Sequence, residues 1–194
     1  MSRYDYDLLV IGGGSGGIRA ARMSATQGVR VALIEEKELG GTCVNLGCVP
    51  KKMFVYGAHY REDFHHAAGY GWQLPAPPVF DWPTLRDRKT ADIERINGAF
   101  DKMLAKAGVK LIRGRAALID SHTAEVNGQI YSAERILLTP GGRPYVPEFP
   151  GSEHVMVSDQ AFFLETLPKD ILVIGGGYIA VEFAGIFNGD RKST

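Results

Sequence analysis

The chain has 194 residues, with 22 Lys and Arg against 22 Asp and Glu, so its formal net charge is zero. This balance gives no sign of a nucleic-acid or membrane partner. The apolar runs are too short to span a bilayer, and the polar N-terminus, MSRYDYD, is not a secretory signal. Two cysteines cannot form a disulfide-stapled scaffold, so we expect a cytoplasmic protein.

The N-terminal segment has the pattern of one βαβ crossover. Residues 5–11 are typical of a short buried strand, and GGGSGG follows at 12–17. An Ala-rich amphipathic stretch at 18–27 is expected to be helical, and residues 30–34 to form a second strand. A strand–turn–helix–strand unit of this length predicts a parallel sheet.

Further elements follow in chain order. We expect a helix from Gly40 to about His59, interrupted by Gly47 and Pro50, and a long helix that begins after the N-cap Asp81 and ends at Gly108. A Gly- and Pro-rich stretch at 141–151 is typical of a linker, and a second strand–glycine–helix unit starts at Ile171. Between the long helix and the linker we predict five short strands, VKLI, RAALI, AEV, QIY and RILLT. Asn127-Gly128 is predicted to form a hairpin turn between two of them.

The glycines are the compositional outlier, at 24 of 194 residues. Gly12-x-Gly14-x-x-Gly17 opens a helix directly after a strand, which lets a pyrophosphate approach the backbone at a helix N-terminus. Glu35 ends the next strand, where an acid is expected to hold the ribose hydroxyls. Gly175-x-Gly177-x-x-Ala180 repeats the fingerprint, but no local residue distinguishes NAD from NADP.

Cys43 and Cys48 lie five residues apart in GGTCVNLGCVPKK. On an ideal helix their Cα atoms would be roughly 8 to 9 Å apart, too far for a disulfide, so a bond requires a distorted helix. Distorted bonds in a cytosolic setting are usually redox-active. Buried inert thiols remain an alternative from spacing alone. A metal site is disfavoured, since no Cys or His partner stands at metal spacing.

These motifs together resemble the glutathione reductases, which belong to the flavoprotein pyridine nucleotide-disulfide oxidoreductases. The resemblance covers about residues 4–189 and corresponds to the N-terminal portion only of that family. Pro50-Lys51-Lys52 after the second cysteine favours this branch over dihydrolipoyl and mercuric reductases, which typically carry PSK. Trypanothione reductases share the tripeptide but usually have an insertion before the cysteine motif, and none is present here.

The resemblance implies an α/β fold: a Rossmann-type FAD-binding domain with a parallel sheet, crossover helices and a β-meander, then the first strand–turn–helix of an NADPH-binding Rossmann domain. We expect the FAD-binding part at 1–150, a linker at 151–167, and the incomplete second domain at 168–194. The resemblance implies cofactor contacts, to FAD or NADPH, for these residues: Gly12, Gly14, Ser15, Gly16, Gly17, Glu35, Gly41, Thr42, Cys43, Lys51, Ala116, Gly141, Gly175, Gly176, Gly177, Tyr178, Ile179 and Glu182.

The resemblance also implies a mechanism and a substrate. NADPH reduces FAD, and the flavin reduces a Cys43–Cys48 disulfide through Cys48. Cys43 then attacks glutathione disulfide, and Cys48 resolves the mixed disulfide. Lys51 is implied to pair with Glu182 beside the flavin as part of the catalytic set, and Tyr178 to cover the flavin until the nicotinamide arrives. Ser15 and Arg22 match substrate contacts.

The chain departs from the family pattern in four ways. Pro140 and Phe100 replace residues common in the family, which removes a backbone N–H and a hydroxyl respectively. The His–Glu pair of the family's interface domain is absent, and GDRKST after Asn188 looks like an unrelated tail. We therefore expect the 194 residues alone to be close to inactive. A FAD-binding module without turnover and a small redox-interaction protein are the alternatives. The resemblance implies a homodimer for the full-length family.

Overall fold

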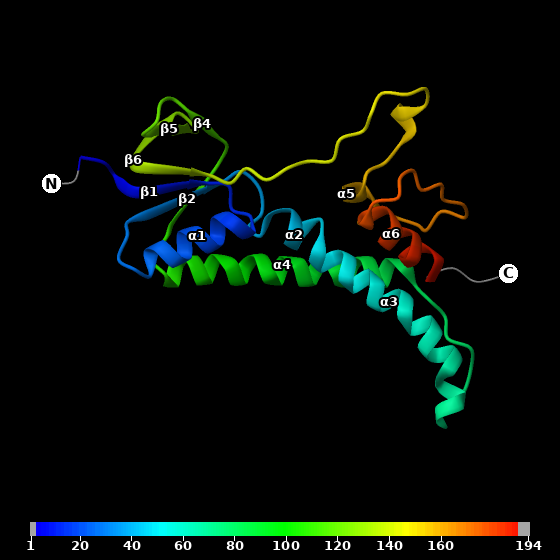
Figure 1. The fold of residues 1–194 in the computed structure, drawn as a ribbon. Helices are drawn as coiled ribbons and strands as arrows, with labels where there is room; N and C mark the ends of the chain where they lie inside the picture. The colour runs from blue at the N-terminus through cyan, green and yellow to red at the C-terminus, as the bar shows by residue number, and fades with distance from the viewer. Residues whose placement is uncertain (1–2, 190–194) are drawn as a thin grey trace. The chain divides into compact units, whose positions relative to one another are not determined.

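The computed structural model describes residues 3–189 (Figure 1). The chain divides into two compact units, which are described separately. The first comprises the chain up to Asn45 together with Ile93–Arg143, and the second comprises Leu46–Asp92 and the chain from Pro144. The long helix α4, Trp82–Lys106, contributes residues to both units.

The first unit is built on a six-stranded sheet with the order β3-β2-β1-β6-β5-β4. The ladders joining β3, β2, β1 and β6 are parallel, and β6, β5 and β4 form an antiparallel meander. The predicted parallel sheet and meander are therefore confirmed. The strands are β1 Tyr6–Ile11, β2 Val31–Glu35, β3 Lys110–Arg113, β4 Ala116–Leu118, β5 Thr123–Val126 and β6 Gln129–Leu138.

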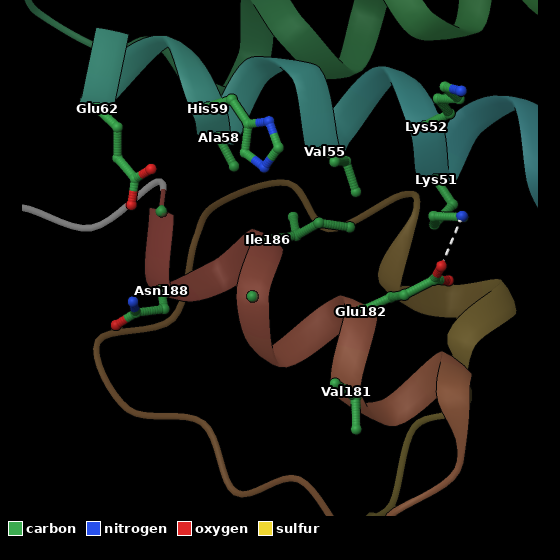
Figure 2. A pocket seen from close by; sticks show the side chains of 12 residues that line it. Lys51, Lys52, Val55, Ala58, His59, Glu62, Val181, Glu182, Ile186 and Asn188 are labelled. Atoms are coloured by element: carbon green, nitrogen blue, oxygen red, sulfur yellow. Dashed lines mark hydrogen bonds and ion pairs between the residues drawn. The ribbon is translucent and has the colours of Figure 1, made fainter. Parts of the chain in front are cut away.

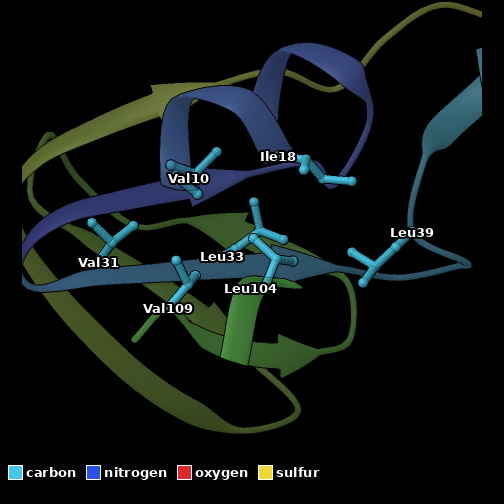
Figure 3. Close-up of a cluster of buried hydrophobic side chains, with 8 residues drawn as sticks. Val10, Ile18, Val31, Leu33, Leu39, Leu104 and Val109 are labelled. Atoms are coloured by element: carbon cyan, nitrogen blue, oxygen red, sulfur yellow. The ribbon is translucent and has the colours of Figure 1, made fainter. Parts of the chain in front are cut away.

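Both faces of the central strands are buried, as a parallel sheet requires. Val10 and Leu33 belong to one cluster, which Ile18 of helix α1 (Ser15–Ala25) and Leu104 of α4 join (Figure 3). Leu9, the neighbour of Val10, belongs to a second cluster that includes residues of the meander. The alternation of side chains along β1 thus supplies two cores from one strand.

The meander differs in one respect from the prediction. The segments QIY and RILLT are not two strands but one, β6, whose first half pairs with β5 and whose second half pairs with β1. The predicted Asn127-Gly128 hairpin is confirmed, with φ of 54° and 79° at its two residues. These positive values match a type I′ turn, which follows the twist of the paired strands.

The second unit is helical. Phe54, Trp82, Phe162 and Phe183 form the centre of its core, and the Phe54 and Trp82 ring centroids are 4.9 Å apart. The Trp82 indole N–H donates to the Leu164 carbonyl at 2.7 Å, so the buried ring leaves no polar atom unpaired. Its elements are α3 Cys48–His66, the first part of α4, α5 Ser158–Ala161, α6 Tyr178–Gly189, and 3₁₀ turns at Ala67–Tyr70 and Ser152–His154.

Two predicted elements require correction. The helix expected from Gly40 to about His59 is two helices, because α2 (Gly41–Asn45) ends before Gly47, whose φ and ψ of −151° and −116° are not helical. The cysteines therefore do not lie on one continuous helix. Pro50 does not interrupt the second helix: it lies in the first turn of α3, where its missing N–H is tolerated.

The strand expected from Ile171 does not form in the structure, although the glycine turn and helix α6 follow it as predicted. A parallel strand exists only as part of a ladder, and none includes these residues in the described part of the chain. Leu172 is accordingly 86% exposed. The predicted GDRKST tail lies almost entirely outside the described residues. Within residues 3–189 no helix has the length and apolarity needed to cross a membrane.

Candidate functional site

The glycine turn between β1 and α1 is closed on one side by its own chain. Gly12 has a φ of +109°, and a Cβ there would overlap the Thr139 carbonyl oxygen. A Cβ on Gly17 would overlap the Gly12 carbonyl oxygen. These two glycines are therefore required by the packing of strand against helix, as the motif predicts.

The other side of the turn is open. A Cβ on Gly14 or Gly16 would meet no atom nearer than 3.7 Å or 3.8 Å respectively. Helix α1 begins at Ser15 without a side-chain cap at Gly14, so its first-turn N–H groups have no intrahelical acceptor. Exposed glycine backbone at an uncapped helix N-terminus can approach and hold an anionic phosphate.

Glu35, at the end of β2, lies against this turn. Its carboxylate accepts hydrogen bonds from the backbone N–H of Gly13 at 2.5 Å and of Lys37 at 2.7 Å. Each carboxylate oxygen retains acceptor capacity for a hydroxyl. The Gly114 N–H donates to the Glu35 carbonyl at 2.9 Å, and Ala116 begins β4 two residues later. The structure thus brings the predicted ribose acid to the glycine turn.

The segment that carries Cys43 is hydrogen-bonded to the same turn. The Gly40 N–H donates to the Gly13 carbonyl at 2.8 Å, and a Cβ on Gly41 would be 2.7 Å from the Gly14 Cα. Helix α2 starts at Gly41, so it presents exposed Thr42 and part-buried Cys43 directly after this contact. Glycine at 41 is required both by this close approach and by its φ of +59°.

Three residues that build this part of the site were not predicted from the sequence. The Thr139 hydroxyl lies 3.0 Å from the Ile11 carbonyl oxygen and 2.8 Å from that of Gly12, where it closes the glycine turn from β6. Its backbone N–H also donates to Ile11, and the ladder ends before Pro140, so the missing N–H at Pro140 costs no bond to β1. Asn45 and Asn97 hold the segment before Cys43. An isolated Asn or Thr carries no sequence signal for such contacts.

The second unit contains the predicted ion pair of Lys51 and Glu182. The Lys51 Nζ, on α3, lies 2.7 Å from Glu182 Oε1, on α6 (Figure 2). Both side chains are about one-quarter to one-third exposed. The hydrogen bond to Glu182 raises the pKa of Lys51 above its usual value, with smaller contributions from Cys48 and Tyr178. Lys51 is therefore a fixed cation at neutral pH.

A groove of about 570 Å³ runs along α3 and α6 beside this pair. Figure 2 shows Lys51 and Glu182 at one end and Glu62 and Asn188 at the other, with Val55 and Ile186 between them. The lining is therefore mixed, with His59 among the apolar side chains and charged residues at both ends.

The remaining predicted residues are accessible. Cys48 is exposed at the start of α3, and Cys43 and Cys48 are both reduced, with no disulfide between them in this structure. Five residues before and within the first turn of α6 are exposed: Gly175, Gly176, Gly177, Tyr178 and Ile179.

Two further predicted residues belong to the first unit. Gly141 follows β6 with a φ of +73°. Arg22 is exposed on α1, seven residues from Ser15 and so on the same side of the helix. Within residues 3–189 no cluster of His, Cys, Asp and Glu is arranged to hold a metal ion.

The fold and the glycine turn define an α/β dinucleotide-binding protein. The family described as pyridine nucleotide-disulphide oxidoreductase matches residues 6–192, and the chain belongs to this family. Membership confirms the predicted Rossmann-type fold class and the oxidoreductase class.

Named relatives agree with the resemblance to glutathione reductases. The chain is 45% identical to "Glutathione reductase, chloroplastic/mitochondrial" of Pisum sativum, over 99% of this chain and 37% of the relative. It is 47% identical to "Glutathione reductase" of Nostoc sp., over 96% of this chain and 40% of the relative. The chain thus spans about two-fifths of the curated relatives that it matches.

A solved structure shares the fold. The Cu(II) complex of the HOCl-induced flavoprotein disulfide reductase RclA from Escherichia coli superposes with a TM-score of 0.80 at 30% identity. The match covers 94% of this chain and 39% of RclA. The similarity extends across nearly all of the present sequence.

Proposed function

We propose that this chain carries the FAD-binding and redox-cysteine part of an NADPH-dependent glutathione-disulfide reductase. The observation that carries the proposal is the hydrogen bond from Gly40 N–H to the Gly13 carbonyl. It ties the segment bearing Cys43 to an open-sided glycine turn suited to a pyrophosphate. A thiol beside a dinucleotide cradle is the arrangement that flavin-dependent disulfide reduction needs.

The residues divide the chemistry between them. FAD, when bound, would supply the two-electron chemistry that links NADPH to the protein disulfide. Residues 12–17 would hold its pyrophosphate and Glu35 its ribose, while Gly41, Thr42, Ala116 and Gly141 would line the remainder. Cys43 thiolate attacks one sulfur of glutathione disulfide and releases one glutathione; Cys48 then displaces the second and regenerates the Cys43–Cys48 disulfide. The balance is NADPH, a proton and glutathione disulfide giving NADP⁺ and two glutathiones.

The other assignments belong to the same proposal. Lys51, held by Glu182, supplies a fixed positive charge near the flavin. Residues 175–179 form the phosphate cradle for NADPH, with Tyr178 covering the flavin, and Ser15 and Arg22 contact glutathione disulfide. We propose an FAD-binding region at 1–150, a linker at 151–167 and the start of the NADPH region at 168–194. A cytoplasmic homodimer completes the proposal.

The glycine cradle is tested by adding one methyl group on its open side. Gly14→Ala places a Cβ 3.7 Å from the nearest atom, so the fold is preserved, but the methyl occupies the approach of the pyrophosphate. We expect flavin retention after reconstitution and dialysis, measured by visible absorbance, to fall about tenfold or more, since even 1.4 kcal/mol of lost contact gives that factor.

Gly98→Ala is the matched control. Gly98 lies within α4 with no atom within 4 Å of an added Cβ, so alanine is tolerated there and flavin retention is unchanged. Equal flavin retention by the Gly14→Ala variant and the parent chain would show that the open side of the glycine turn does not bind the pyrophosphate. NADPH-dependent reduction of glutathione disulfide by the parent chain distinguishes a reductase from a flavin-holding module without turnover.

The two cysteines are separated by spectroscopy. Cys48→Ser is expected to abolish the long-wavelength thiolate-to-flavin absorbance that appears on reduction, because Cys48 is assigned the position next to the flavin. Cys43→Ser is expected to retain that band, because Cys43 is assigned the attack on glutathione disulfide and not the position next to the flavin. A band that persists unchanged in Cys48→Ser would exchange the roles of the two thiols.

A further inference from the structure

Two asparagines, far apart in sequence, form a hydrogen-bonded pair behind the segment that carries Cys43. The Asn97 side-chain amide donates to the Leu39 carbonyl at 2.6 Å and to Asn45 Oδ1 at 2.9 Å. The Asn45 amide donates in turn to the carbonyls of Glu38, Leu39 and Gly41 at 3.3, 3.2 and 3.0 Å. The pair therefore satisfies three backbone carbonyls between Glu38 and Gly41.

The same segment is also held by the bond from the Gly40 N–H to the Gly13 carbonyl, at 2.8 Å. Gly40 and Gly41 both have positive φ, and glycine backbone has the largest freedom to lose. Helix α2 has only five residues, which is too short to be stable by itself. Leu39 and Val44 anchor it in the core through apolar contacts, which are non-directional.

Asn97 adds a directional restraint to this segment from α4. It is only 7% exposed on α4, the helix from which Phe100, Met103 and Leu104 join the hydrophobic cluster of the sheet. Both amide hydrogens of Asn97 are used, one on a backbone carbonyl and one on the side chain of Asn45. Removing the amide would leave the Leu39 carbonyl, itself in a fully buried residue, with the longer bond to Asn45 alone.

We propose that Asn97 is a positioning residue that acts through Asn45 to set the accessibility and reactivity of the Cys43 thiol. This inference deepens the proposed function, since it gives the attacking thiol a rigid support from the long helix. It is independent of whether the chain binds flavin, because the network consists only of residues of the first unit.

The test measures the reactivity of Cys43 itself. In a Cys48→Ser background Cys43 is the one remaining thiol, because the chain has two cysteines. The second-order rate of iodoacetamide alkylation is followed from pH 6 to 10 for the parent, Asn97→Ala, Asn45→Ala and a control. The control is Asn127→Ala, which removes an asparagine amide that donates to the Arg113 carbonyl at 3.0 Å, away from the segment.

We expect Asn97→Ala and Asn45→Ala each to raise the alkylation rate about threefold or more and to shift its pH midpoint, since the part-buried thiol gains access to water and reagent. The double variant is expected to match the single ones, because both remove one network. Asn127→Ala is expected to lower thermal stability without altering the alkylation rate of Cys43 or the pH midpoint of that rate. It therefore controls for general destabilisation.

An alkylation profile of Asn97→Ala equal to that of Asn127→Ala overturns the proposal. If Asn97→Ala fails to fold, Asn45→Ala, at a part-buried position, decides alone. No flavin, NADPH or glutathione enters this assay, so failure here and failure of the flavin-retention assay are separate results.

Discussion

At the scale of single residues, Lys89 is a charged group in an apolar place. Its side chain is only 1% exposed, in a position on α4 that packs in the core of the helical unit. The Nζ lies 4.1 Å from the centroid of the Phe163 ring and 6.0 Å from that of Phe54. Burial, aided by the positive charge of Arg86, lowers the pKa of Lys89 to about 8.

This lowered pKa predicts that stability increases with pH. Unfolded lysine has its ordinary value of about 10.5, so between pH 8 and 10.5 the unfolded chain binds more protons than the folded one. The free energy of unfolding should therefore rise across this window, by at most about 3 kcal/mol. Below pH 8 Lys89 is protonated in both states, so it contributes no pH dependence to the free energy of unfolding. Urea unfolding followed by the fluorescence of Trp82, in the same cluster, measures it.

Lys89→Met removes the titrating group and keeps the length of the side chain. The variant is expected to be more stable than the parent near pH 7 and to lose the advantage by pH 10. Because other groups titrate equally in both proteins, the difference between them isolates Lys89. A difference that stays constant with pH would show that the amine is solvated in the folded chain.

At the scale of elements, the local sequence was sufficient to predict those elements whose structure depends on neighbouring residues. The turn at Asn127-Gly128 and the start of α4 after Asp81 depend on residues within three positions of each other, and both are confirmed. Elements that depend on distant partners were predicted less well. Residues 171–174 have the composition of a strand but no ladder, and β6 joins two segments that local composition separates.

The cap of α4 gives a prediction at this scale. Asp81 Oδ2 accepts a hydrogen bond from the Thr84 N–H at 2.9 Å. Hydrogen bonding with the Thr84 side chain, and then with this N–H, lowers the pKa of Asp81. Asp81→Ala leaves that N–H without its cap and should lower Tm by roughly 2–4 °C. Asp81→Asn retains an oxygen acceptor and should stay near the parent value in a calorimetric scan.

The same cap should respond to acid. The folded pKa of Asp81 is depressed, so its contribution is present above the ordinary value and is lost as the pH falls through the folded value. Asp81→Asn, which cannot titrate, should therefore lose less stability than the parent below pH 4. Equal Tm for Asp81→Ala and Asp81→Asn at neutral pH would show that the bond contributes nothing.

At the scale of the whole molecule, the site combines residues of different predictability. The glycine turn and Glu35 follow from a local pattern that the chemistry of phosphate binding dictates. The Lys51–Glu182 pair joins residues 131 positions apart and was expected only through the family resemblance. Asn97 and Lys89 were not expected at all, because polar residues within a helix usually face solvent, and only packing shows that these two do not.

The bare stretch from Ile171 to Ile174 has a practical consequence for anyone who handles this protein. Proteases bind their substrates as extended chains, and exposed segments outside regular structure are where they cut. Here four apolar residues are held outside any ladder, immediately before a glycine-rich turn. Cleavage at this point would detach α6, and with it the carboxylate that holds Lys51, while leaving the glycine turn and Cys43 on the larger fragment.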